Sequence, residues 1–219
     1  MRGLGAGPRG RLSSAGGGGT VDLKGARAIA GDYLLTAAQT IELAIGECLD
    51  DIVVAFECCV TSLRAGGKLL ICGNGGSAAD AQHLATEFMS TLTLDNPRPS
   101  IPAVALTTDT SLLTAIANDF GIERVFARQV ESLGHAGDVL IAISTSGNSE
   151  NVIRAAEQAR IQRVAVVALT GSSGGRLAPG ADVAIRVPSM VTAHIQECHL
   201  AIEQLIALLV ERELYPPNG

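Results

Sequence analysis

The chain has very few aromatic residues and no tryptophan, since Phe, Tyr and Trp together make up 3% of its 219 residues. Leu, Ile, Val and Ala must therefore fill the core. Because 47% of the residues are hydrophobic and only 17% are charged, that core can be sizeable. The length favours one large domain. Runs of 18 or more apolar residues are missing, so we expect no membrane span.

Basic residues are outnumbered, with 16 Lys and Arg against 22 Asp and Glu, and the formal net charge is -6. This balance argues against nonspecific binding to nucleic acid. The five cysteines show no zinc-finger spacing and lie in apolar or helical stretches, which predicts reduced, buried thiols in a cytoplasmic protein. They are Cys48, Cys58, Cys59, Cys72 and Cys198.

The first twenty residues lack an apolar stretch long enough for a secretory signal, and they contain a run of four glycines at 16–19. Such a run cannot offset the entropy that ordering would cost. We predict a disordered Gly-rich tail without function over residues 1–20, followed by a single domain over residues 21–215.

Residues 69–90 hold the most informative stretch. A short apolar run at 69–72 predicts a buried strand, a turn of small residues follows at 73–77, and a helical pattern resumes at Ala78. A strand, a glycine-rich turn and a helix together place backbone N–H groups and a helix N-terminus around an anion, usually a phosphate.

Residues 21–65 show helical periodicity, which predicts two helices or one long kinked helix ending at Gly66 and Gly67. The apolar surface of this segment is too wide for an ordinary surface helix. It is expected to pack against a second copy of the chain or against the chain's own sheet, and oligomerisation is favoured.

Strands alternate with helices along the rest of the chain. Further strands are predicted at 101–106, 139–143, 164–169 and 183–187, and helices at 112–117, 125–133, 151–160 and 192–213. This order predicts an α/β fold, with a parallel sheet covered by helices on both sides. Polar loops follow the strands, which is where open α/β sheets bind ligands.

The loop at 144–149, Ser-Thr-Ser-Gly-Asn-Ser, carries four hydroxyl groups between a strand and a helix. Hydroxyl and N–H groups at a helix N-terminus can bind phosphate without a lysine. The sequence is neither a Walker loop nor a GxGxxG dinucleotide motif. One serine-rich turn is usually only a turn, but two such turns after strands favour a binding site.

His83 and Glu87 are four residues apart and lie on one face of the predicted helix. Such a pair can chelate a divalent metal or transfer a proton, although an isolated helical histidine is more often structural or solvated. Candidate partners on the last helix, and further polar groups near strand ends, are Gln196, His199, Glu203, Gln204, Asp109, Asn118 and Asp119.

Four motifs make a family resemblance recognisable: CGNGGSAADAQH at 72–83, LTAIANDFG at 113–121, GDVLIAISTSGNS at 137–149 and IQECH at 195–199. They resemble the sugar isomerase (SIS) domain and, within it, the phosphoheptose isomerases. The resemblance covers nearly all of residues 25–215. It implies a flavodoxin-like three-layer sandwich with a five-stranded parallel sheet, and a homotetramer with active sites at subunit contacts.

The resemblance also implies an activity, the conversion of sedoheptulose 7-phosphate to D-glycero-D-manno-heptose 7-phosphate through an enediol or enediolate. This is the first step toward nucleotide-activated heptose for cell-surface glycans such as lipopolysaccharide. By the same resemblance, the substrate-binding residues would be Asn74, Gly75, Gly76, Ser77, Thr108, Asp109, Ser144, Thr145, Ser146, Ser149 and Gln196. Zinc would be held by His83, Glu87, Gln196 and Gln204, and catalysis would fall to Glu87 and the residue at 204.

At one position the chain departs from that family. The second acid–base group of the family, a histidine, falls on Gln204, which cannot exchange a proton near neutral pH and is a poor zinc ligand. One hypothesis is that His199 replaces the acid–base group that is lost at position 204. The departure leaves open an alternative of another class, because LTAIAND, LGHAGDVLIAIST and LYPP also resemble the DnaA initiator-associating protein. Such a homologue would bind the replication initiator DnaA or a sugar phosphate without catalysis.

Overall fold

The computed structural model describes residues 22–92 and 96–216. The predicted tail at 1–20 lies outside these residues. Contacts between residues divide the chain into a short unit that ends at Leu34 and a larger unit over residues 35–219. The boundary falls within helix α1 (Leu23–Glu47), and the described part of the short unit is the first half of this helix.

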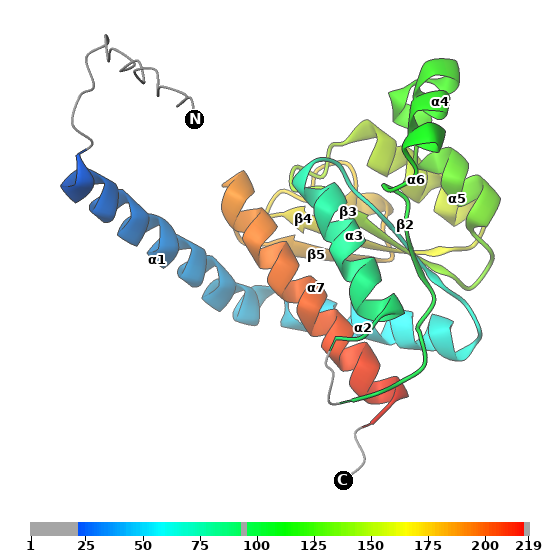
Figure 1. The fold of residues 1–219 in the computed structure, drawn as a ribbon, viewed down its shortest axis with the longest axis horizontal. Helices are drawn as coiled ribbons and strands as arrows, with labels where there is room; N and C mark the ends of the chain where they lie inside the picture. The colour runs from blue at the N-terminus through cyan, green and yellow to red at the C-terminus, as the bar shows by residue number, and fades with distance from the viewer. Residues whose placement is uncertain (1–21, 93–95, 217–219) are drawn as a thin grey trace, which may run out of the picture. The chain divides into compact units, whose positions relative to one another are not determined.

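The larger unit is an α/β fold built on five parallel strands in the order β2-β1-β3-β4-β5 (Figure 1). The strands are β1 (Leu69–Cys72), β2 (Ala103–Ala105), β3 (Val139–Ile143), β4 (Ala165–Gly171) and β5 (Val183–Val187). The predictions for β1, β3 and β5 are confirmed to the residue. Strand β2 is shorter than predicted, and β4 extends through Thr170 and Gly171, which the sequence pattern had placed in a loop.

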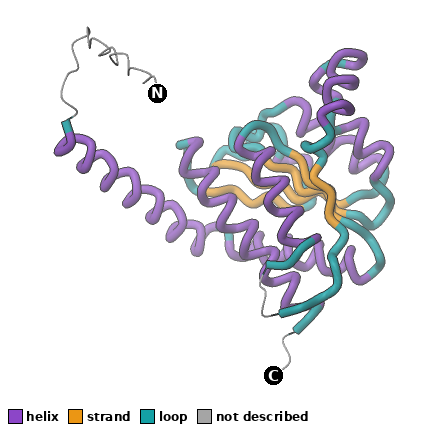
Figure 2. Tube along the Cα trace, in the orientation of Figure 1, coloured by secondary structure: helices purple, strands orange, loops and turns teal. Residues whose placement is uncertain are grey.

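Helices cover both faces of the sheet, so the predicted three-layer arrangement is confirmed (Figure 2). Alternate residues of each strand point to opposite faces. Leu69 and Ile71 pack with one core cluster, whereas Leu70 and Cys72 pack with the other. The first cluster lies under α2 (Leu49–Arg64), α3 (Gly76–Met89) and α7 (Thr192–Leu214).

The second cluster lies under α4 (Thr110–Phe120), α5 (Ala127–Leu133) and α6 (Glu150–Ile161), joined by the short 3-10 helix Ile122–Arg124. A second 3-10 turn spans Ala178–Gly180. The helical prediction over 21–65 resolves into two helices that meet at Cys48. None of the helices in the described ranges is both long and apolar enough to cross a membrane.

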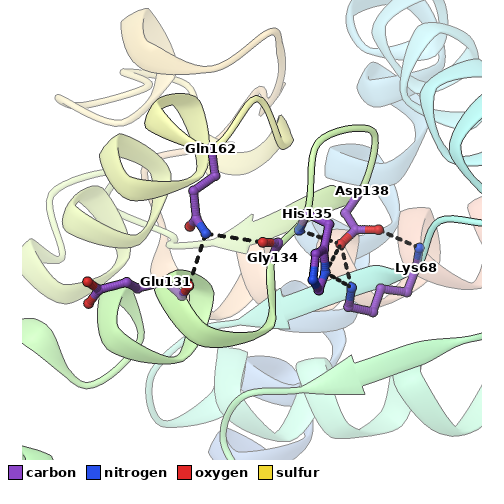
Figure 3. A network of polar contacts seen from close by, with 6 residues as sticks. All are labelled: Lys68, Glu131, Gly134, His135, Asp138 and Gln162. Carbon is purple, nitrogen blue, oxygen red and sulfur yellow. Dashed lines mark hydrogen bonds and ion pairs between the residues drawn. The ribbon is translucent and has the colours of Figure 1, made fainter.

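A polar network joins the N-terminal ends of β1 and β3 (Figure 3). The carboxylate of Asp138 accepts hydrogen bonds from the backbone N–H of Lys68 at 2.9 Å, the ammonium of Lys68 at 2.5 Å and the backbone N–H of His135 at 2.8 Å. Nearby, the amide of Gln162 donates to the carbonyl oxygens of Glu131 and Gly134. Asp138 therefore ties together the starts of two central strands.

Replacing Asp138 with asparagine is expected to lower the free energy of unfolding by about 1–3 kcal/mol at pH 7. Burial alone would raise the pKa of the Asp138 carboxyl, but the bonds from Lys68 and His135 outweigh it and hold that pKa below its ordinary value. The carboxylate thus stabilises the fold above the pKa of an unfolded aspartate, and this stabilisation disappears as the pH falls through the lower folded value. Urea unfolding between pH 3 and pH 7 measures it, and an Asp138→Asn curve with unchanged acid dependence would contradict it.

Candidate active site

The two predicted phosphate-binding turns follow strands β1 and β3, which are neighbours at the centre of the sheet. The chain leaves β1 toward α3 on one face and leaves β3 toward α6 on the other (Figure 1). Parallel sheets of this strand order open a crevice between two such strands, beyond their carboxyl ends. The sheet therefore brings together two turns that lie about seventy residues apart in the sequence.

Two asparagines join the turns directly. The side-chain amide of Asn74 donates to the Oδ1 of Asn151 at 2.8 Å, and the amide of Asn151 donates back to the Oδ1 of Asn74 at 2.9 Å. Asn74 follows β1, and Asn151 lies in the first turn of α6. This reciprocal pair fixes the spacing between the N-terminal ends of α3 and α6.

The serine-rich turn is folded by its own hydroxyl groups. Ser144 donates to the hydroxyl of Ser149 over 3.1 Å, and the hydroxyl of Ser146 accepts the backbone N–H of Asn148. Gly147 has a φ of +64°, and a Cβ atom there would collide with the carbonyl oxygen of Gly174, so only glycine fits. The turn ends at Ser149, the N-cap of α6, where the helix dipole favours an anion.

The turn after β1 enters its helix sooner than the sequence pattern predicts. Helix α3 begins at Gly76 rather than Ala78, and Gly75 precedes it with a φ of +55°. Ser77 consequently lies in the first helical turn, where its hydroxyl donates to the Oε1 of Gln196 at 3.2 Å. The amide nitrogen of Gln196 in turn donates to the carboxylate of Asp80. Gln196 from α7 therefore reaches the turn after β1.

Thr108 and Asp109 follow the edge strand β2. The Oδ1 of Asp109 accepts the backbone N–H of Leu112 at 2.9 Å and caps α4. Gln82 on α3 donates to the hydroxyl of Thr107, which holds this loop next to the helix that carries His83. A groove of about 720 Å³ between α3 and β2 includes Thr108 in its lining, but it includes none of the serines of the two turns.

His83, Glu87 and Gln204 meet on adjacent faces of α3 and α7. The Nε2 of His83 lies 3.1 Å from the Oε1 of Glu87. The amide nitrogen of Gln204 lies 2.5 Å from that Nε2 and 3.2 Å from that Oε1. The side chain of Glu87 is 15% exposed and that of His83 is 47% exposed, so solvent reaches the pair mainly at His83.

The predicted zinc site is divided in this structure. His83 and Glu87 lie close enough together to chelate one ion, since zinc bonds to nitrogen and oxygen are about 2.0–2.2 Å long. Gln196 is engaged with Ser77 and Asp80 instead. Within the described part of the chain, no three His, Cys, Asp or Glu side chains form a metal-binding group. The donor set thus falls short of the three or four strong ligands of a zinc centre, and zinc stays an expectation.

His199 and Glu203, which the sequence grouped with Gln196, lie in the core. The ring of His199 is fully buried, and its Nε2 lies 3.1 Å from the carbonyl oxygen of Thr170. Burial lowers the pKa of His199 to about 4. Burial, with a smaller contribution from the Asp80 carboxylate, raises the pKa of Glu203 to about 9. Gln204, and not His199, contacts the His83–Glu87 pair.

Two residues that the sequence did not single out, Asp80 and Arg98, contact residues of the candidate site. Asp80 lies seven residues before Glu87, so the helical spacing of α3 could have indicated it. Arg98 carried no such signal. Its guanidinium donates to the carbonyl oxygens of Glu87 at 2.6 Å and Phe88 at 2.8 Å, and it lies 2.6 Å from the carboxylate of Glu211 on α7.

Comparison with known proteins agrees with this fold. The model of the SIS domain family matches residues 32–171. A phosphoheptose isomerase of Roseiflexus sp. is 55% identical over 164 residues, which are 75% of this chain and 82% of the relative. A phosphoheptose isomerase of Rhodospirillum rubrum is 50% identical over 182 residues, which are 83% of this chain and 95% of the relative.

Solved structures give the same result. A phosphoheptose isomerase from Neisseria gonorrhoeae superposes with a TM-score of 0.80 at 42% identity, over 84% of this chain and 98% of the other. One from Francisella tularensis gives a TM-score of 0.82 at 36% identity, over 85% and 98%. The chain belongs to the SIS domain family and, within it, to the group of the phosphoheptose isomerases. Its activity class is therefore that of the sugar phosphate isomerases, which interconvert aldoses and ketoses.

Proposed function

We propose that this protein converts sedoheptulose 7-phosphate to D-glycero-D-manno-heptose 7-phosphate, the first step toward nucleotide-activated heptose, and that it does so in the cytoplasm. The observation that carries the proposal is the convergence of two phosphate-type turns, linked by Asn74 and Asn151, beside a helix that presents Glu87. The names of the relatives at about half identity support the choice of a heptose phosphate.

The phosphate end of the substrate would be held by hydroxyl and backbone N–H groups rather than by a cation. Ser77 lies in the first turn of α3, and the 144–149 turn ends at the N-cap of α6. Two helix N-termini that point at one crevice give a partial positive charge without lysine or arginine. A neutral cradle of this kind suits a phosphate that must be bound and released in each turnover.

The isomerisation itself needs one proton to move between neighbouring carbons. Glu87 would take a proton from C1 of the ketose, leaving an enediolate with its charge on O2, and return that proton to C2. The hydroxyl proton of O1 passes to O2, which completes the aldose. Its Oε1 faces His83 and Gln204, both of which constrain the rotation of the carboxylate. A carboxylate with one oxygen held by two contacts is well placed for such a transfer, because its orientation is set before the substrate arrives.

A homotetramer is part of the proposal. Apolar side chains on the second half of α1 and on α2 remain largely exposed, while Ala44, Cys48 and Ile52 are buried in the chain's own core. This segment therefore packs some apolar residues on the chain's own core and leaves others free to pack on a second copy of the chain. The exposed residues over this part of the chain include Leu35, Leu43, Ile45, Leu49 and Val54. Exposed apolar side chains that gather on one segment are expected at an interface.

A coupled assay with sedoheptulose 7-phosphate tests the function on the purified full chain, with its mass in solution measured by light scattering. The expected result is turnover by a tetramer, with a kcat on the order of 1–1000 per second as in typical enzymes. Turnover of a different sugar phosphate would keep the isomerase proposal and change only the proposed substrate. Absence of turnover by the intact oligomer, together with binding of the DnaA initiator, would replace the enzyme proposal with the non-catalytic alternative.

A further inference from the structure

The amide of Gln204 lies where two acceptor atoms converge. Its nitrogen is 2.5 Å from the Nε2 of His83 and 3.2 Å from the Oε1 of Glu87, and those two atoms are 3.1 Å apart. A primary amide carries two hydrogens on one nitrogen, so a single –NH₂ group can donate to both acceptors. Gln204 thereby bridges the two strongest candidate metal ligands of the chain.

The chemistry of Glu87 decides which end of the amide faces the pair. An ionised carboxylate only accepts hydrogen bonds. If the amide were turned over, its carbonyl oxygen would lie against the carboxylate oxygen, and two acceptors would repel each other. The –NH₂ group must therefore face Glu87. The Nε2 of His83 lies within reach of both groups, and it accepts from the amide in one tautomer and donates to the carboxylate in the other.

A divalent cation would need the same two lone pairs. Zinc binds the nitrogen of a neutral imidazole and the oxygen of a carboxylate directly, at about 2.0–2.2 Å. The bridging amide has to leave before such an ion can enter, and the departing amide offers only a weak carbonyl ligand in exchange. Gln196 does not supply the missing metal ligand, because its amide is bonded to Ser77 and Asp80.

We propose that the amide of Gln204 takes the place that a divalent cation would otherwise fill, so that hydrogen bonds alone orient His83 and Glu87 and the site works without a metal. Only the kinetic part of this inference rests on the proposed function. The metal-binding part concerns the residues themselves and can be measured on a protein of any activity.

The test compares the full-length wild-type protein with Gln204→His, which restores a strong ligand next to His83 and Glu87. Each protein is treated with a chelator, freed of it by gel filtration and titrated with zinc by calorimetry, and the bound metal is counted by mass spectrometry. Gln158→His is the matched control, because Gln158 lies on α6 and bonds to Gln162, away from the site. The expected result is zinc binding to Gln204→His at one ion per chain, at least about tenfold tighter than to wild type or control.

The kinetic arm uses the wild-type protein alone, so it does not depend on the folding of a variant. Chelator treatment is expected to leave its turnover within about twofold, which corresponds to under 0.5 kcal/mol. Stoichiometric zinc on the wild-type protein as purified, or turnover that is lost with the chelator and returns with zinc, would overturn the inference. Equal zinc affinity in wild type and Gln204→His would also overturn it. If no protein turns over the heptose phosphate, the proposed function fails, while the zinc titrations still decide the role of Gln204.

Discussion

Replacing Glu87 with glutamine is expected to lower the kcat of isomerisation by about 1000-fold, within the range of 10²–10⁴ that a positioned acid–base group contributes. Glutamine keeps the size of the side chain and an oxygen that can accept from Gln204, but it cannot take a proton from carbon. The affinity for the sugar phosphate should change little, because Ser77 and the 144–149 turn, which are proposed to bind the phosphate, bond to groups other than Glu87. Steady-state kinetics and calorimetric binding of the substrate separate the two effects.

The control for this experiment is Glu157→Gln, an equivalent change at an exposed position on α6. Its kcat should remain that of the wild type. A Glu87→Gln protein that is folded and retains more than about a tenth of the turnover would show that Glu87 is not the proton-transfer group, because an acid–base role contributes at least about 100-fold. Another group in the crevice would then be the one that transfers the proton.

Replacing Glu211 with leucine is expected to cost about 3–5 kcal/mol of unfolding free energy, because it leaves the guanidinium of Arg98 buried without its counter-ion. Both side chains are almost fully buried, at 1% and 3% exposure, and lie 2.6 Å apart. The carboxylate also accepts the backbone N–H of Leu92. Urea unfolding of Arg98→Met, of Glu211→Leu and of the double variant gives the coupling energy, and the double variant should recover much of the loss.

A matched control lies two residues further along α7. Glu213 pairs with Arg64, but these side chains are 46% and 57% exposed, so Glu213→Leu should cost at most about 1 kcal/mol. Equal losses in the two leucine variants would contradict a special role for the buried pair. The Arg98 pair is also expected to affect activity, because Arg98 bonds to the carbonyl oxygen of Glu87 and links the end of α3 to α7. Turnover by Glu211→Leu should therefore fall even where the protein remains folded.

The strands and helices were largely readable from the sequence because local physics specifies them. Strands β1 and β3 are short, continuous apolar runs bounded by small residues, and both were predicted to the residue. The turns after them were recognisable because only glycine and small polar residues fit there. The edges of β2 and β4 were misjudged, since pairing with a neighbouring strand, and not local composition, decides where a strand ends.

Within the site, the sequence by itself determined the ingredients: the Ser144–Ser149 hydroxyls, the His83–Glu87 pair at helical spacing, and the presence of glutamine at 204. Only the tertiary structure decided which of them meet. Gln204 reaches His83 and Glu87 across 121 and 117 residues of sequence, whereas His199 turns into the core toward Thr170. Helical periodicity gives the angle of a side chain around its own axis. It does not give the partner that this axis packs against, and the packing of α7 on α3 settled that choice.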